Sequence, residues 1–306
     1  MTPRLKEGKI RHDWRRNYSY YLILLPVLLY YFIFLYIPMG GLLMAFERFN
    51  AAKGIFHSPW IWFGNFATFF KSYYFWRLIR NTVVLSLLGL FFGVVSPVGL
   101  ALLLNEVKNR YFKKTIQTAT YIPYFISLVV AASLIKIFVA PEGPIGALFN
   151  SLFGLDKNLL TYVDLFRPIM VVSDMWTMTG YIAVIYLAAL SGIDHEQYEA
   201  ARIDGAGHWK QLVHITIPGI APTVIVLFIM RTGQLLNVGY EKIILLYSPG
   251  IYETADVIST FVYRKGLIEL QYGYSAAVGL FNAVVGLLLI IGTNWLAKRY
   301  SETRLF

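Results

Sequence analysis

Six long runs of apolar residues, almost free of charge, limit this chain's fold more than any other feature of the sequence. A helix that crosses a bilayer needs about 20 such residues, because lipid offers the backbone no hydrogen-bond partners and the helix must satisfy them internally. The runs therefore predict an all-α polytopic membrane protein with six transmembrane helices. The expected spans cover residues 20–44, 81–105, 117–140, 168–190, 218–238 and 275–297.

The composition supports this class and excludes several others. Only 14% of the 306 residues are charged and 57% are hydrophobic, whereas soluble domains carry about 25% charged residues. A soluble enzyme is therefore excluded. The chain has no cysteine, which rules out disulfides, thiol catalysis and cysteine-ligated metal. We expect a short N-terminal segment, 1–19, followed by one membrane domain, 20–306.

The basic residues indicate the orientation of the spans. The net charge is +10, but the lysines and arginines flank apolar runs and form no soluble basic face, which argues against nucleic acid as a partner. With a cytoplasmic N-terminus, 15 of the 27 basic residues fall in the four inner segments, although these are much shorter in total than the outer loops. Lys and Arg favour the cytoplasmic side, so both termini are predicted to be cytoplasmic. The first run is too long for a cleaved signal peptide and is interpreted as a retained anchor.

The loop between the fourth and fifth spans, 191–217, has the features of a short helix. Asp194 is a suitable N-cap, and Glu196 would lie in the first turn, where an acidic side chain favours the helix dipole. Gly205 can adopt the left-handed conformation that ends a helix. Pro218 would then lie in the first turn of the following span, where proline is tolerated.

The same loop resembles the EAA motif of the permease subunits of binding-protein-dependent ABC importers. That pattern is Glu-Ala-Ala, a glycine after three intervening residues and a hydrophobic-Pro pair about a dozen residues further on. Stretches 117–127, 185–190, 252–259 and 301–306 also look like the subgroup that imports complex oligosaccharides. The residues that match the EAA pattern are Glu199, Ala200, Ala201, Asp204, Gly205, Ala206 and Pro218.

The resemblance implies a type I importer fold in a bacterial cytoplasmic membrane. It also implies four kinds of partner: a second, homologous permease, two ATPase subunits, an extracytoplasmic solute-binding protein and an oligosaccharide such as an alginate or rhamnogalacturonan fragment. The helix from Glu196 to Asp204 would be the coupling helix that contacts the ATPase. The chain lacks the phosphate-binding pattern Gly-x4-Gly-Lys-Ser/Thr, so ATP and Mg²⁺ are expected on the partner ATPases and no cofactor on this chain.

Polar residues inside spans suggest a substrate path, since ionisable groups in a membrane usually face a cavity or a partner. Asp174 and Arg231 lie about 9 and 10 Å below the outer ends of their spans, counted at about 1.5 Å per residue. Two interpretations remain open: the pair locks two helices together, or both face the substrate, with Arg231 meeting uronate carboxylates. The candidate path residues are Asp174, Trp176, Thr177, Tyr181, Arg231, Gln234, Asn237 and Asn282.

Two other functions were compared with the importer. An ion-coupled secondary sugar carrier would use Asp174 as its proton or cation site, and a membrane-embedded enzyme would act on lipid-linked sugars. Neither explains the 199–218 match. The five histidines all lie outside the spans, and His195-Glu196 lacks the second histidine of a zinc motif, so neither a catalytic residue nor a metal site is expected.

Overall fold

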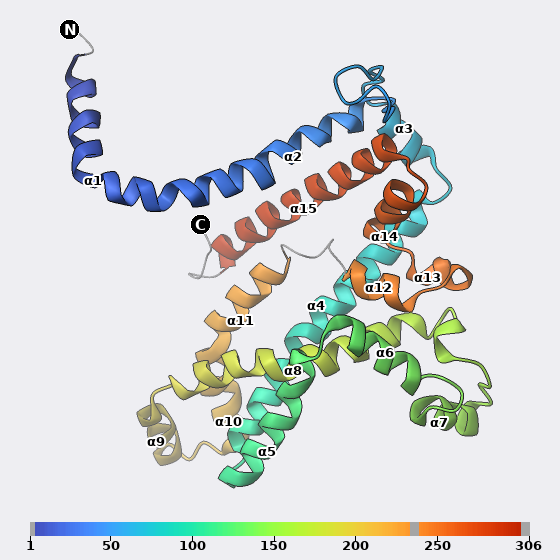
Figure 1. Ribbon diagram of the computed structural model, residues 1–306. Helices are drawn as coiled ribbons and strands as arrows, with labels where there is room; N and C mark the ends of the chain where they lie inside the picture. The colour runs from blue at the N-terminus through green and yellow to red at the C-terminus, as the bar shows by residue number, and fades with distance from the viewer. Residues whose placement is uncertain (1–3, 233–238, 301–306) are drawn as a thin grey trace.

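A computed structural model describes residues 4–232 and 239–300, with side chains over 17–232 and 239–295. The described chain is almost entirely helical, and its β pairing is limited to one isolated bridge between Glu47 and Trp60. Figure 1 shows long helices packed side by side with shorter helices at both ends of the bundle. The all-α class expected from the apolar runs is confirmed.

Five helices are long and apolar enough to span a membrane, and a bent helix pair makes six if it counts as one span. Their positions agree with the expected runs, although most extend beyond them at one or both ends. The five are Asn17–Phe46, Phe75–Glu106, Phe166–Ser191, His208–Thr232 and Tyr272–Trp295. The named helices of this membrane core are α1 (Arg4–Tyr31), α2 (Ile37–Met39), α4 (Phe75–Glu106), α8 (Phe166–Ser191), α11 (Ile217–Thr232) and α15 (Tyr272–Tyr300).

Shorter helices connect the spans. They are α3 (Gly64–Lys71), α5 (Arg110–Tyr121), α6 (Leu128–Phe138), α7 (Pro144–Phe153), α9 (His195–Ile203), α10 (His208–Gln211), α12 (Tyr240–Leu246), α13 (Tyr252–Ala255) and α14 (Ile258–Tyr263). In Figure 1, α9 and α10 lie at one end of the bundle, whereas α3, α7 and α13 lie towards the other. The two ends therefore present different surfaces.

The expected third span, 117–140, is broken and not straight. Helix α5 continues into a 3-10 turn, Ile122–Phe125, and α6 then leaves at an angle of 107°. Pro123 lacks the N–H that a continuing helix needs. Ile126 is extended, and Ser127 caps α6 by accepting a hydrogen bond from the Val130 N–H at 3.4 Å. The break thus follows from a local proline and a new N-cap.

The fifth span begins earlier than expected. Its helix starts at His208 and passes through a π-helical turn, Leu212–Thr216, before α11. Pro218 lies in the first turn of α11 but well inside the continuous helix. A proline clashes with the carbonyl of the fourth residue before it, and the wider π turn changes the backbone spacing at that point. Residues 233–238 of the expected span lie outside the described chain.

Helices α4 and α8 form the centre of the described bundle. At the end near α9 they enclose an apolar cluster with α11, built from Ala101, Ala183, Tyr186, Leu190 and Ile220. In the next layer along both helices, the Ser96 and Thr179 hydroxyls are 2.9 Å apart. Apolar side chains thus pack α4, α8 and α11 together at the end near α9.

At the other end, the buried carboxylate of Asp256 joins the short helices to α4. Asp256 is fully buried and accepts hydrogen bonds from Arg264 at 2.6 and 3.0 Å, Arg77 at 3.4 Å and the Thr260 hydroxyl at 2.9 Å. Burial lowers the pKa of Arg264, but the hydrogen bonds and charge of Asp256 outweigh it, so the pKa of Arg264 lies above its usual range. Arg264 is therefore a permanent cation in this network.

Candidate functional site

The 191–217 loop forms the helix that its residues predict. Helix α9 covers His195–Ile203, and the Asp194 carboxylate accepts a hydrogen bond from the Glu196 N–H at 3.0 Å. Gly205 has a φ of +76°, and the Ala206 N–H donates to the Ala201 carbonyl at 2.8 Å. The predicted N-cap and glycine stop are confirmed. The helix ends one residue before Asp204, which is its C-cap.

Helix α9 is exposed in the isolated chain. None of its residues is buried, and two large apolar side chains beside it, Ile203 and Trp209, are 87% and 73% exposed. Exposed apolar groups of this size close together are typical of a protein-binding surface. The geometry therefore leaves α9 free to contact another subunit.

Three polar contacts fasten the α9 region to the bundle. The hydroxyls of Tyr198 and Thr216 are 2.9 Å apart, which links α9 to the fifth span. Gln211 donates to the Ala206 carbonyl at 2.8 Å. The His208 ring and Glu106, at the end of α4, are 3.3 Å apart. A displacement of α9 would therefore act directly on the fifth span through Tyr198, and on α4 only through His208 at the start of the fifth span.

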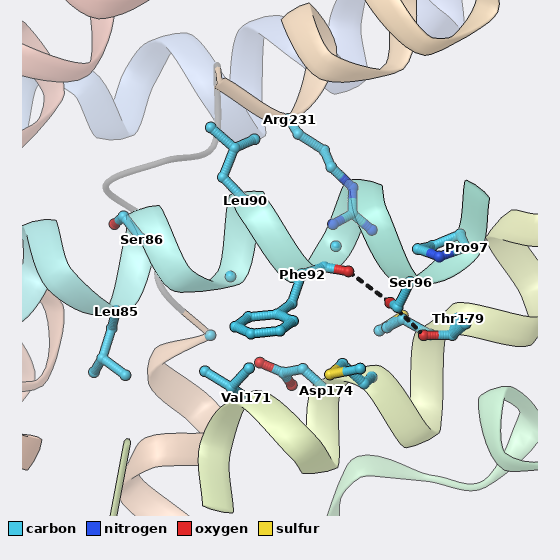
Figure 2. A pocket seen from close by; sticks show the side chains of 15 residues that line it. Leu85, Ser86, Leu90, Phe92, Ser96, Pro97, Val171, Asp174, Thr179 and Arg231 are labelled. Carbon is cyan, nitrogen blue, oxygen red and sulfur yellow. Dashed lines mark hydrogen bonds between the residues drawn. The ribbon is translucent and has the colours of Figure 1, made fainter. Parts of the chain in front are cut away.

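A cavity of 340 Å³, with a mainly apolar lining into which a few polar and charged side chains project, lies between α4, α8 and α11. In Figure 2, Asp174 from α8 and Arg231 from α11 both reach it, and the Ser96–Thr179 hydrogen bond lies at one side. We call this the polar cavity. Its lining residues include Ser86, Gly89, Gly93, Ser96, Val171, Asp174, Met178, Thr179 and Arg231.

Within the polar cavity, Asp174 pairs with a residue that the sequence reasoning missed. Lys242 Nζ of α12 lies 2.6 Å from Asp174 Oδ1, and the lysine side chain is only 6% exposed. None of the ion pairs among the described residues includes Arg231. Lys242 lies between the fifth and sixth expected spans, next to the apolar residues 243–246, and this position is the only sequence signal for the partner.

The remaining path candidates on α8 lie outside the polar cavity or bond locally. The Thr177 hydroxyl donates to the Ser173 carbonyl of its own helix at 3.0 Å. Tyr181 stacks on Tyr124, with ring centroids 3.7 Å apart. Trp176 is 38% exposed on another side of α8. These residues therefore do not gather around Asp174 in the isolated chain.

Asn282 lies in a second, larger groove along α15, together with Ser259, Gly279 and Gly286. Its side-chain oxygen is buried and has no hydrogen-bond partner among the described residues. Gln234 and Asn237 lie outside the described residues. Of the candidate path residues, the polar cavity thus brings together Asp174 and Arg231 but not Asn282.

Among the described residues, no group of three or more metal-ligating side chains is positioned to hold a metal ion. The described site offers one carboxylate, two cations and several hydroxyls. These groups can bind, orient and release a polar or anionic solute.

Comparison with known proteins identifies the class. Residues 86–302 match the family described as the inner membrane component of binding-protein-dependent transport systems. The match covers most of the chain, so this protein belongs to that family. It is a membrane-embedded permease subunit with no catalytic activity of its own.

Similar individual proteins come from Bacillus subtilis. The chain is 43% identical to Protein LplB over 95% of this chain and 92% of LplB. It is 40% identical to the polygalacturonan/rhamnogalacturonan transport system permease protein YteP, over 94% and 89% of the two chains. A chain of a bacterial ABC transporter involved in the import of the acidic polysaccharide alginate superposes with a TM-score of 0.89 at 41% identity, covering 96% of this chain and all of the other. The expected type I permease fold is therefore confirmed.

Proposed function

We propose that this chain is one of two permease subunits of an ATP-driven importer for complex oligosaccharides, with uronate-containing fragments as its natural class. One observation carries the proposal. The chain is 42% identical, with a TM-score of 0.87 and 96% coverage, to a chain of the alginate transporter in complex with an alginate pentasaccharide-bound periplasmic protein. Such similarity over nearly the whole length favours a shared transport mode.

The partners follow from the same relationship. A solute-binding protein delivers the oligosaccharide to the outer face, a second permease completes the path, and two ATPase subunits bind Mg²⁺-ATP on the cytoplasmic face. The permease contributes no phosphate-binding loop. Both termini face the cytoplasm of the bacterial membrane, as the distribution of basic residues indicates.

Helix α9 couples the ATPase to the spans. Its exposed surface, with Ile203 and the neighbouring Trp209, binds a groove of the ATPase. When ATP closes the ATPase dimer, the movement reaches the fifth span through Tyr198 and Thr216 and reaches α4 through Glu106. Access then alternates between the two sides. The coupling residues are Glu196, Glu199, Ala200, Ala201, Asp204, Gly205, Ala206 and Pro218.

The oligosaccharide passes along the polar residues of the membrane core. Asp174 and Arg231 line the polar cavity. Trp176 and Tyr181 are partly exposed, and a sugar ring can stack on Trp176 or on the face of Tyr181 that Tyr124 does not cover. Thr177, Gln234, Asn237 and Asn282 supply further hydrogen-bonding groups along the path.

The proposal is tested in proteoliposomes that contain this chain, its partner permease and the ATPase, with binding protein added. ATP hydrolysis is measured with and without oligosaccharide on the binding protein. We expect loaded binding protein to stimulate hydrolysis. Glu199→Lys and Gly205→Asp should abolish the stimulation, because they place a wrong charge or a strained side chain on the α9 surface. Glu142→Lys, the same charge change on the exposed segment before α7, is the matched control.

Two outcomes would contradict this function. Uptake by the chain alone, driven by an ion gradient and indifferent to ATP, would indicate a secondary carrier. Normal assembly and normal stimulation of ATP hydrolysis in both Glu199→Lys and Gly205→Asp would show that the EAA motif does not couple the ATPase to this chain. The Lys242 contact already occupies the carboxylate that a carrier would use for its ion.

A further inference from the structure

The charges at the polar cavity do not balance. Lys242 is almost completely buried, and Asp174, half-exposed, is the carboxylate bonded to it at 2.6 Å. A buried ammonium requires such a counter-charge. Together the two form a neutral pair. Arg231 remains as a cation without an ion-pair partner among the described residues, and it lines the same cavity.

The guanidinium of Arg231 occupies a space that exists only because α4 has a glycine there. A Cβ atom built on Gly93 would lie 1.6 Å from Nη1 of Arg231. Gly99, also on α4, does not line the polar cavity, and a Cβ at that position would meet nothing within 4 Å. Figure 2 shows Arg231 reaching from α11 towards α4. Gly93 is therefore a close-approach position, whereas Gly99 is not.

We infer that Arg231, seated against Gly93, forms an anion site in the polar cavity that binds the carboxylate of an acidic sugar during transit. This inference rests on the proposed import function and adds the residues that recognise charge. Gly93 is a positioning residue, since it acts through Arg231. The Asp174–Lys242 pair keeps the site at one net positive charge.

Physical chemistry favours this ligand class. A guanidinium offers two parallel N–H donors that fit both oxygens of a carboxylate. An unpaired cation in a partly dehydrated cavity attracts an anion more strongly than it would in water. A single such contact is also weak enough to release its ligand, as transport requires. A neutral sugar would leave the guanidinium unpaired.

The test compares variants of the whole complex in proteoliposomes. The probe is an alginate pentasaccharide on its binding protein, and both ATP-dependent uptake and ATP hydrolysis are measured. We expect Gly93→Ala and Arg231→Gln to lower uptake at least about tenfold, the loss of one charge-assisted contact. Arg231→Lys should recover part of the uptake. Gly99→Ala should transport like the unchanged chain, and stimulation of hydrolysis by loaded binding protein should persist in all four.

A double-variant cycle separates positioning from packing. If Gly93 acts through Arg231, adding Gly93→Ala to Arg231→Ala should cause no further loss, because the colliding guanidinium is gone. A further loss in that background would overturn the positioning role. Direct binding of the pentasaccharide to the complex without binding protein, measured by calorimetry, should weaken in Arg231→Gln and should fall with added salt.

Failure of this inference differs from failure of the proposed function. If the unchanged complex imports the pentasaccharide with ATP but Arg231→Gln and Gly93→Ala transport like Gly99→Ala, the anion-site inference is wrong and the proposed import function is still supported. If the unchanged complex shows no ATP-dependent uptake and calorimetry detects no salt-sensitive binding, both are wrong.

Discussion

At the scale of single residues, two cations, Lys242 and Arg231, could pair with the Asp174 carboxylate. The structure pairs Asp174 with Lys242. The two residues are 68 positions apart in the sequence. Lys242 is more deeply buried than Asp174, so leaving its ammonium unpaired would cost more free energy. This choice leaves Arg231 free for a ligand, which is why the pairing matters for function as well as for stability.

Asp174→Ala should therefore destabilise the chain through Lys242. An uncompensated buried ammonium costs several kcal/mol, but water reaches the half-exposed Asp174 side, so we expect about 2 kcal/mol. Thermal unfolding of the purified complex, followed by an intrinsic fluorescence change, measures this effect. The double variant Asp174→Ala with Lys242→Met should recover most of the lost stability, since it removes the buried charge. No recovery would contradict the pair's assigned role.

At the scale of elements, α9 combines a locally determined helix with a small number of tertiary contacts. Its N-cap and glycine stop are properties of its own residues. Its attachment is not local, because Tyr198 reaches Thr216 in the π-helical turn. The π turn thus lies where the coupling region meets the fifth span, a position in which such turns often serve function.

Tyr198→Phe should weaken coupling without preventing assembly. The change removes one hydroxyl and its hydrogen bond, worth about 1 kcal/mol, while the ring still packs. Stimulation of ATP hydrolysis by loaded binding protein should fall severalfold, and co-purification with the ATPase should be retained. Tyr73→Phe, which removes a hydroxyl from an 87% exposed side chain, is the matched control. Equal stimulation in both variants would mean that the contact transmits nothing.

At the scale of the whole molecule, the first span lies along one side of the bundle and buries none of its most apolar window inside the chain. Figure 1 shows α1 away from the other helices and α2 beside α15. A helix that is apolar all round is stable only in lipid or against another subunit. The first span therefore faces lipid or another subunit.

The orientation of the molecule can be tested directly because the chain has no cysteine. Single cysteines are introduced by Lys108→Cys, next to the α9 end, and by Glu142→Cys, before α7; both positions are exposed. In intact cells, a membrane-impermeant maleimide should label only Glu142→Cys. Lys108→Cys should react after permeabilisation, because the basic 106–116 segment is predicted to be cytoplasmic. The reverse pattern would contradict the predicted topology.

Much of the fold was predictable from the sequence because the relevant physics is local. Apolar runs identify spans, Asp194 and Gly205 delimit α9, and the motif around Glu199 indicates the family. The break at Pro123 was not predicted, since hydropathy averages over a bend. The early start of the fifth span at His208 was also missed, because its first turns are polar.

The sequence by itself determined the membrane class, the number of spans, the α9 helix and the transporter family, since each depends on neighbouring residues. Only the tertiary structure decided which cation pairs with Asp174, that Gly93 makes room for Arg231, and that Asn282 faces a different groove. The physical reason is distance along the chain. Contacts between residues far apart depend on how helices pack, and no local pattern records that packing.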